Sequence, residues 1–69
     1  MKSEAELVRL AQLHVKRGEV LVDEQAERVR RMRARGFDAT APEDLLRSMQ
    51  AMLLEWRLDL ERRESDAKG

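Results

Sequence analysis

The chain contains no cysteine and no tyrosine, and it has one proline and one histidine. Without cysteine it forms no disulfides, and a structural zinc site would have only the single histidine to draw on. Phenylalanine and tryptophan occur once each, and aromatic residues make up 3% of the chain. This composition is unlike that of β structure, and it indicates long solvated helices instead.

A long apolar run is also absent. The longest one, Ala51 to Leu54, is far too short to span a bilayer. The opening residues MKSEAE contain no apolar core of the kind that directs export. We therefore expect a cytoplasmic protein that makes no contact with a membrane.

An excess of either charge is missing as well, because 14 basic residues balance 14 acidic ones. This balance argues against a protein whose main work is to coat phosphate backbones. A chain of 69 residues forms one small domain. Such a domain buries only about 60% of its unfolded surface. With disulfides excluded, oligomerisation is the common remaining support, and we expect a homodimer.

Two segments carry apolar residues at alternating spacings of three and four, which place them on one stripe of an α-helix. In the first segment the stripe consists of Val8, Ala11, Val15, Gly18, Val22, Gln25, Val29 and Met32. In the second it consists of Leu46, Met49, Leu53, Trp56 and Leu60. A single turn separates them. The pattern predicts an all-α fold, an antiparallel two-helix hairpin in one domain over residues 1–69.

Capping signals predict where the first helix begins and ends. Ser3 and Glu6 match a capping box, so that the helix begins near residue 3. Gly36 can take the left-handed conformation, and Phe37 would then lie against Met32, as in a Schellman motif. The first helix is therefore expected over residues 3–35.

The second helix is predicted over residues 41–63. Thr40 and Glu43 match another capping box, and Pro42 suits a first helical turn, where no N–H is required. After residue 63 the apolar periodicity stops, and residues 64–69 are expected to form a frayed tail.

Gly18 allows two interpretations. Lys16 and Arg17 precede it, so that it could close a helix, but the stripe keeps its phase across it, which favours one continuous helix. An antiparallel count about Asp38 places Trp56 near Val20, within a turn of Gly18, whose missing side chain makes room for the indole. The residues expected to pack between the helices are Gly18, Val22, Gln25, Met49, Leu53 and Trp56. Among these, the amide of Gln25 needs a hydrogen-bond partner and is expected to set the register.

The predicted helices differ in length, at about 48 Å and about 34 Å for the standard rise per residue. The first helix would then extend beyond the second, and apolar residues surround this overhang instead of lining one face. We expect self-association through Leu7, Val8, Leu10, Ala11, Leu13 and His14, which pairs two hairpins into a four-helix bundle. The alternative is an adaptor or inhibitor that docks this overhang on a different protein.

No arrangement of residues predicts catalysis or a cofactor. His14 has no second ligand four residues away, and Glu19 points elsewhere on the helix, so that a metal site is not expected. The ordinary interpretation of His14 is a partly buried imidazole bonded to a carboxylate or a carbonyl. No nucleophile with a base and no glycine-rich phosphate loop can be assembled, and we expect a protein that is not an enzyme.

The strongest charge cluster lies at the end of the first helix and consists of Arg28, Arg30, Arg31, Arg33 and Arg35. Its ordinary interpretation is a solvated face in which Glu24 pairs with Arg28 and Glu27 pairs with Arg31. The alternative is a stripe at the tip of the hairpin that binds RNA or DNA.

The spacing HVxxGExxVxxQ from His14 to Gln25, followed by Gly36-Phe37-Asp38 and the pair Leu45-Leu46, resembles short uncharacterised bacterial helical-hairpin proteins. The resemblance implies the fold and no activity. Phe37 stands where that group often has histidine, and Thr40 lies one place later than the threonine of the group. The architecture is also similar to that of the small dimeric RNA-binding hairpins of plasmid copy control, as an analogy of fold alone. Together these features predict a small interaction or regulatory module that acts as a homo-oligomer.

Overall fold

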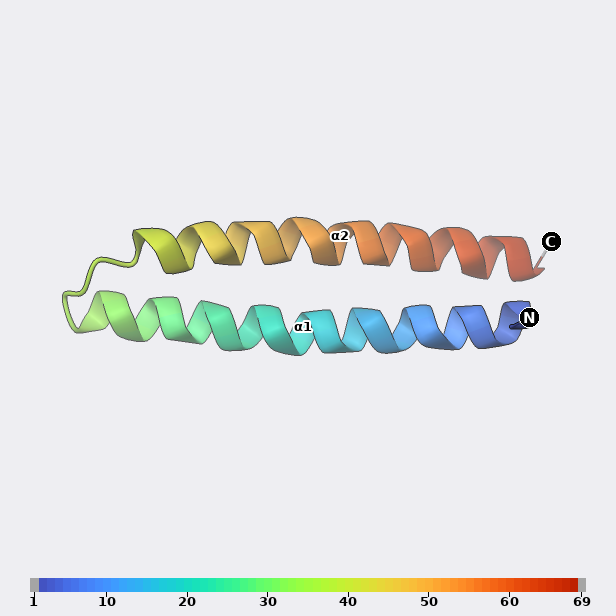
Figure 1. Cartoon of the computed structure of the whole chain (residues 1–69), viewed down its shortest axis with the longest axis horizontal. Helices are drawn as coiled ribbons and strands as arrows, with labels where there is room; N and C mark the ends of the chain where they lie inside the picture. The colour runs from blue at the N-terminus through green and yellow to red at the C-terminus, as the bar shows by residue number, and fades with distance from the viewer. Residues whose placement is uncertain (1, 69) are drawn as a thin grey trace.

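The computed structural model describes residues 2–68 and consists of two helices, α1 (Glu4–Ala34) and α2 (Thr40–Lys68). They lie side by side and antiparallel along their whole length (Figure 1). The molecule is a rod with extents of 51 × 18 × 14 Å. No strand occurs in the described part of the chain. The predicted all-α hairpin is therefore confirmed.

The start of α1 is capped as predicted, although by half of the capping box. The Ser3 hydroxyl accepts a hydrogen bond from the N–H of Glu6 at 3.2 Å. Among residues 2–68, no reciprocal bond joins the Glu6 carboxylate to the Ser3 N–H. Glu4 and Glu6 also place negative charge in the first turn, where the helix dipole favours it.

The end of α1 is a Schellman motif. Gly36 has a φ of 77°, in the left-handed region that favours glycine. The Phe37 N–H donates to the Met32 carbonyl at 2.9 Å, and the Gly36 N–H donates to the Arg33 carbonyl at 3.0 Å. These are the two bonds that define the motif. The predicted stop is confirmed.

The start of α2 differs from the prediction. Asp38 Oδ1 accepts from the Thr40 N–H at 3.0 Å and from the Thr40 hydroxyl at 2.7 Å. The predicted capping box of Thr40 with Glu43 is therefore wrong, because Asp38 already engages the hydroxyl and Glu43 pairs with Arg33. The hydroxyl and N–H bonds from Thr40 lower the pKa of Asp38 below its ordinary value.

The other end of α2 also differs, since the helix continues to Lys68. The predicted end at residue 63 is wrong, and residues 64–68 are helical; Gly69 lies outside the described residues. Asp59 pairs with Arg62 and with Arg63, each at 2.8 Å. Hydrogen bonds from Arg63 and Arg62 lower the pKa of Asp59. Beyond these pairs, Arg63 and Asp66 line a groove with Leu7 and Val8 of α1, so the last turns of α2 lie against the first turns of α1.

This longer α2 removes the predicted overhang of α1. The start of α1 and the end of α2 lie at the same end of the rod (Figure 1). Leu7 and Val8 line a shallow groove with Arg63 and Asp66 of α2. The expectation that the second helix cannot reach the N-terminal turns is therefore wrong, because it depended on a helix end placed about a turn too early.

The helices approach each other closely at Gly18, and α1 is continuous through it. A Cβ atom at Gly18 would lie 2.9 Å from Leu53 Cδ1 and 3.1 Å from the Trp56 ring. The prediction that Gly18 admits the indole is confirmed. Leu53 also borders a groove with Val22. The predicted register is therefore correct to within a turn, with Leu53 closer to Gly18 than expected.

Buried apolar residues are few. Within residues 2–68 they are Ala11, Val15, Val29, Ala39 and Leu53. Gln25 is buried among them, and its Nε2 donates to the Pro42 carbonyl at 2.9 Å. This bond satisfies the amide, as expected, and it ties the middle of α1 to the first turn of α2.

Candidate functional site

The two sides of the hairpin differ in chemistry. On one side Glu19 of α1 pairs with Arg57 of α2 across 3.5 Å. Asp23 and Gln50 border the groove between them. We call Glu19, Asp23, Gln50 and Arg57 the polar face. Its charged groups are paired or solvated, so it needs no further partner.

On the opposite side the ring of His14 lies against that of Trp56, with centroids 5.8 Å apart and planes tilted by 42°. Leu21 follows His14 by seven residues on α1, and Leu45 precedes Met52 by seven on α2, so each pair shares a helix stripe. Leu21, Leu45 and Met52 are 45–51% exposed. We call these five residues the His14–Trp56 face.

The residues predicted for self-association take several environments. Ala11 is buried inside the hairpin itself. Leu7, Val8 and Leu10 are half-buried. Only Leu13 and His14 are exposed, and of these His14 belongs to the His14–Trp56 face. The turns of α2 after residue 63 therefore lie beside part of the predicted surface, at Leu7 and Val8, whereas Leu10 and Leu13 line an open groove. Self-association through these residues stays a prediction.

His14 itself differs from expectation. It is exposed, it contacts an aromatic ring, and in residues 2–68 it makes no side-chain hydrogen bond. The prediction of a partly buried, hydrogen-bonded imidazole is wrong. The described residues contain no group of three or more histidine, aspartate or glutamate side chains arranged to hold a metal ion.

The arginine cluster divides into paired and unpaired members. Glu27 binds Arg30, with a 3.1 Å bond to Nε, and not the predicted Arg31. The Arg30 bond lowers the pKa of Glu27. Arg33 Nε donates to Glu43 of α2 at 2.8 Å. No ion pair joins Glu24 to Arg28 within residues 2–68.

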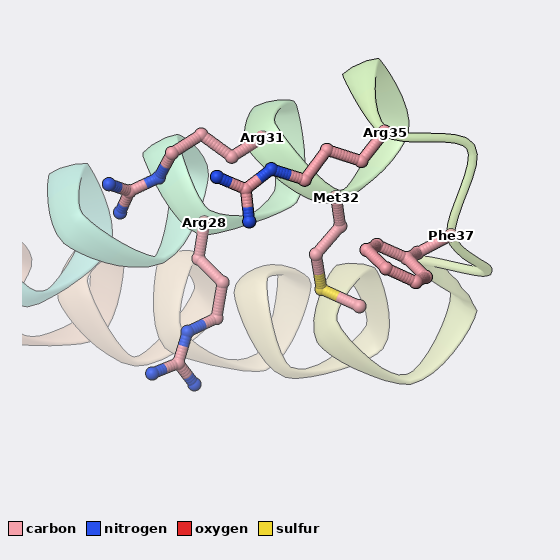
Figure 2. A pocket seen from close by; sticks show the side chains of 5 residues that line it. All are labelled: Arg28, Arg31, Met32, Arg35 and Phe37. Carbon is pink, nitrogen blue, oxygen red and sulfur yellow. The ribbon is translucent and has the colours of Figure 1, made fainter.

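The other three arginines lie on a different side of α1. In the part of the chain that the structure describes, Arg28, Arg31 and Arg35 take part in no ion pair. Together with Met32 and Phe37 they line an open groove of about 450 Å³ at the tip of the hairpin (Figure 2). We call this the arginine groove.

Phe37 is the member of this groove that sequence reasoning missed. The sequence assigned it only the contact with Met32 that accompanies a Schellman motif. That contact is present, and Figure 2 shows the Met32 sulfur beside the ring, yet Phe37 is 61% exposed. The signal was available, because Gly36 turns the chain back and leaves the next side chain beside the preceding helical turn.

No helix within residues 2–68 is long and apolar enough to cross a membrane. Comparison with protein-family models, with curated proteins and with solved structures finds no match for this chain. The resemblance to bacterial helical hairpins therefore stays a prediction.

Proposed function

We propose that this protein is a small, non-enzymatic interaction module of the cytoplasm that acts as a homodimer. Two hairpins pack through their His14–Trp56 faces into a four-helix bundle. The observation that carries the proposal is this face, on which three large aliphatic side chains that are 45–51% exposed share one side of the hairpin with the ring pair of His14 and Trp56.

The thin core supports the proposal. No large side chain within residues 2–68 is less than 2% exposed, and the buried apolar set contains one leucine and no aromatic residue. Burial of exposed aliphatic side chains is worth about 25 cal/mol per Å² of apolar surface. Covering the His14–Trp56 faces of two hairpins would therefore add a few kcal/mol to a domain whose stability alone is marginal.

A second copy suits this face better than a charged partner does. The chain has no net charge, so two copies do not repel each other at long range. A two-fold axis brings an apolar stripe against the same stripe of the second copy, and this is the self-complementary contact of a symmetric dimer. The alternative, docking of an N-terminal overhang on another protein, is weakened because Arg63 and Asp66 of α2 lie beside Leu7 and Val8, so that only Leu10 and Leu13 remain on an open groove.

Sedimentation and thermal melting test the proposal. Leu45→Glu with Met52→Glu places charge on the face, and we expect a monomer with a lower melting temperature. Wild-type protein should sediment as a dimer, with a melting temperature that rises with protein concentration. The matched control is Leu54→Glu with Leu58→Glu, since these leucines of α2 are somewhat more exposed than Leu45 and Met52 and lie on a different side of the helix.

The control variant should remain dimeric. A wild-type protein that is monomeric at tens of micromolar, with a melting temperature independent of concentration, contradicts the proposal. Equal dissociation of the two double variants contradicts the choice of face.

A further inference from the structure

The three unpaired arginines form an ordered stripe on α1. Arg28, Arg31 and Arg35 are spaced by three and four residues, which places them on one side of the helix. At 1.5 Å per residue the stripe is about 10 Å long. Arg30 and Arg33, in the same turns, are instead held by Glu27 and Glu43. The hairpin therefore carries paired and unpaired guanidinium groups side by side.

Acidic groups near the tip neutralise this stripe only in part. Glu27 and Glu43 are engaged by the two paired arginines, and Asp38 accepts both bonds from Thr40. The C-terminal end of α1 contributes only about half a negative charge. Three unpaired guanidinium groups outweigh it, so that the groove attracts anions.

The exposed ring of Phe37 adds an apolar surface to this cationic stripe. The bond from its N–H to the Met32 carbonyl holds the residue beside the last turn of α1. Met32 covers part of the ring, and more than half of the side chain faces solvent at the groove. A flat aromatic surface next to several arginines is the combination that binds bases and phosphates of an unpaired strand.

We propose that the arginine groove binds single-stranded nucleic acid. One base stacks on Phe37, and successive phosphates contact Arg28, Arg31 and Arg35. A single strand fits better than a duplex because paired bases are stacked on each other and offer no free face to the ring. With three cationic contacts the site is weak and sensitive to salt.

The salt dependence is the first quantity to measure. Three phosphate contacts on a single strand give a slope of log K against log salt of about −2. Binding is followed by the fluorescence anisotropy of labelled oligo-dT and oligo-U, which separate DNA from RNA, and of a duplex of equal length. We expect either single strand to bind more tightly than the duplex.

Two double variants of equal charge test the stripe. Arg28→Gln with Arg31→Gln should weaken binding roughly tenfold or more in low salt and reduce the slope to about −0.7. Arg30→Gln with Arg33→Gln removes the same charge from arginines that are already paired, and it should weaken binding much less. Glutamine has a helix propensity close to that of arginine, and melting curves check that both variants fold.

Phe37→Leu tests the stacked base. Leucine keeps an apolar contact with Met32 and removes the aromatic face. Stacking on an aromatic side chain is worth about 1–3 kcal/mol per base, so the variant should bind roughly 5- to 150-fold more weakly. The salt slope should not change, because no phosphate contact is lost.

Four results would overturn the proposal. They are the absence of binding to either single strand in low salt, equal losses from the two arginine variants, unchanged binding by Phe37→Leu, and binding of the duplex or of polyglutamate as tight as that of the single strands. Arg28 follows Leu21 by seven residues, so the groove lies on the same side of α1 as the His14–Trp56 face. Binding is therefore also measured on Leu45→Glu with Met52→Glu, in which the proposed dimer contact is lost, so that failure of the site and failure of the homodimer are distinguished.

Discussion

The polar face and the His14–Trp56 face are built by the same two helices over the same length, yet they leave different kinds of side chain exposed. Across the polar face Glu19 and Arg57 meet at 3.5 Å and stay about half exposed. On the other face Leu21, Leu45 and Met52 are exposed to a similar degree. Water solvates the first set well and the second set poorly.

This difference shows what a two-helix hairpin can and cannot bury. Its seam covers one narrow stripe of each helix, here centred on Gly18 and Leu53. Apolar residues to either side of that stripe need another layer. The polar face places the Glu19–Arg57 pair there, beside the exposed Leu54, whereas the His14–Trp56 face places leucine, methionine and tryptophan, and for that reason we propose that a second copy covers it.

The largest effect is expected where the seam meets the His14–Trp56 face. The new side chain in Gly18→Leu would clash with Leu53 and the Trp56 ring, and this overpacking should lower folding stability by about 1–3 kcal/mol. Displacement of the indole should also change the tryptophan fluorescence. Gly18→Ala is the graded control, since its gain of roughly 1 kcal/mol in helix propensity offsets part of the contact. Unchanged melting and emission for Gly18→Leu would contradict this packing.

The next effect concerns Gln25, between the two faces. Gln25→Glu places a buried carboxylate opposite the Pro42 carbonyl. The variant should lose about 1–3 kcal/mol of folding stability at neutral pH. Burial raises the pKa of the new carboxyl above about 4.3. Protonation restores a donor, so the melting temperature relative to wild type should fall as pH rises from about 4 to 7.

Gln50→Glu, on the exposed polar face, is the control for that variant. It should change stability by less than about 0.5 kcal/mol and show no such dependence on pH. A similar loss in both variants would mean that Gln25 is not buried in solution.

A smaller effect is expected on the polar face itself. Arg57→Gln breaks the pair with Glu19, and exposed pairs of this kind are worth about 0–1 kcal/mol. The difference from wild type should disappear in about 1 M salt, where the screening length is about 3 Å. A salt-independent loss would show that Arg57 acts through packing.

The smallest effect is expected at the start of α2. Hydrogen bonds from Thr40 lower the pKa of Asp38 in the folded protein. The carboxylate therefore stabilises the fold at pH values above its ordinary pKa of 3.8, and this stabilisation is lost as the pH falls through the lowered pKa. The melting temperature of Asp38→Asn should therefore be slightly below that of wild type at neutral pH and equal to it in acid. Melting curves from pH 7 to about pH 2 check this.

Local rules were sufficient for several features. The three-four spacing predicted the hairpin, and Gly36 predicted the stop of α1, because helix period and left-handed backbone are properties of neighbouring residues. The fit of Trp56 at Gly18 followed from counting along the chain. Each of these features depends on residues that are close in sequence or on the simple antiparallel pairing.

Other features needed the tertiary structure. The sequence by itself determined that this chain forms two amphipathic helices joined by one tight turn, since those elements follow from local spacing. The bonds from Thr40 to Asp38, two residues away, are local, and the capping-box pattern missed them. Only the tertiary structure decided that the last turns of α2 lie beside Leu7, that Gln25 bonds the Pro42 carbonyl, and which arginines stay unpaired. The reason is physical. The rotation and register of one helix on the other decide which side chains meet, and competing partners within one turn differ by only a few tenths of a kcal/mol, about the strength of an exposed ion pair on a helix.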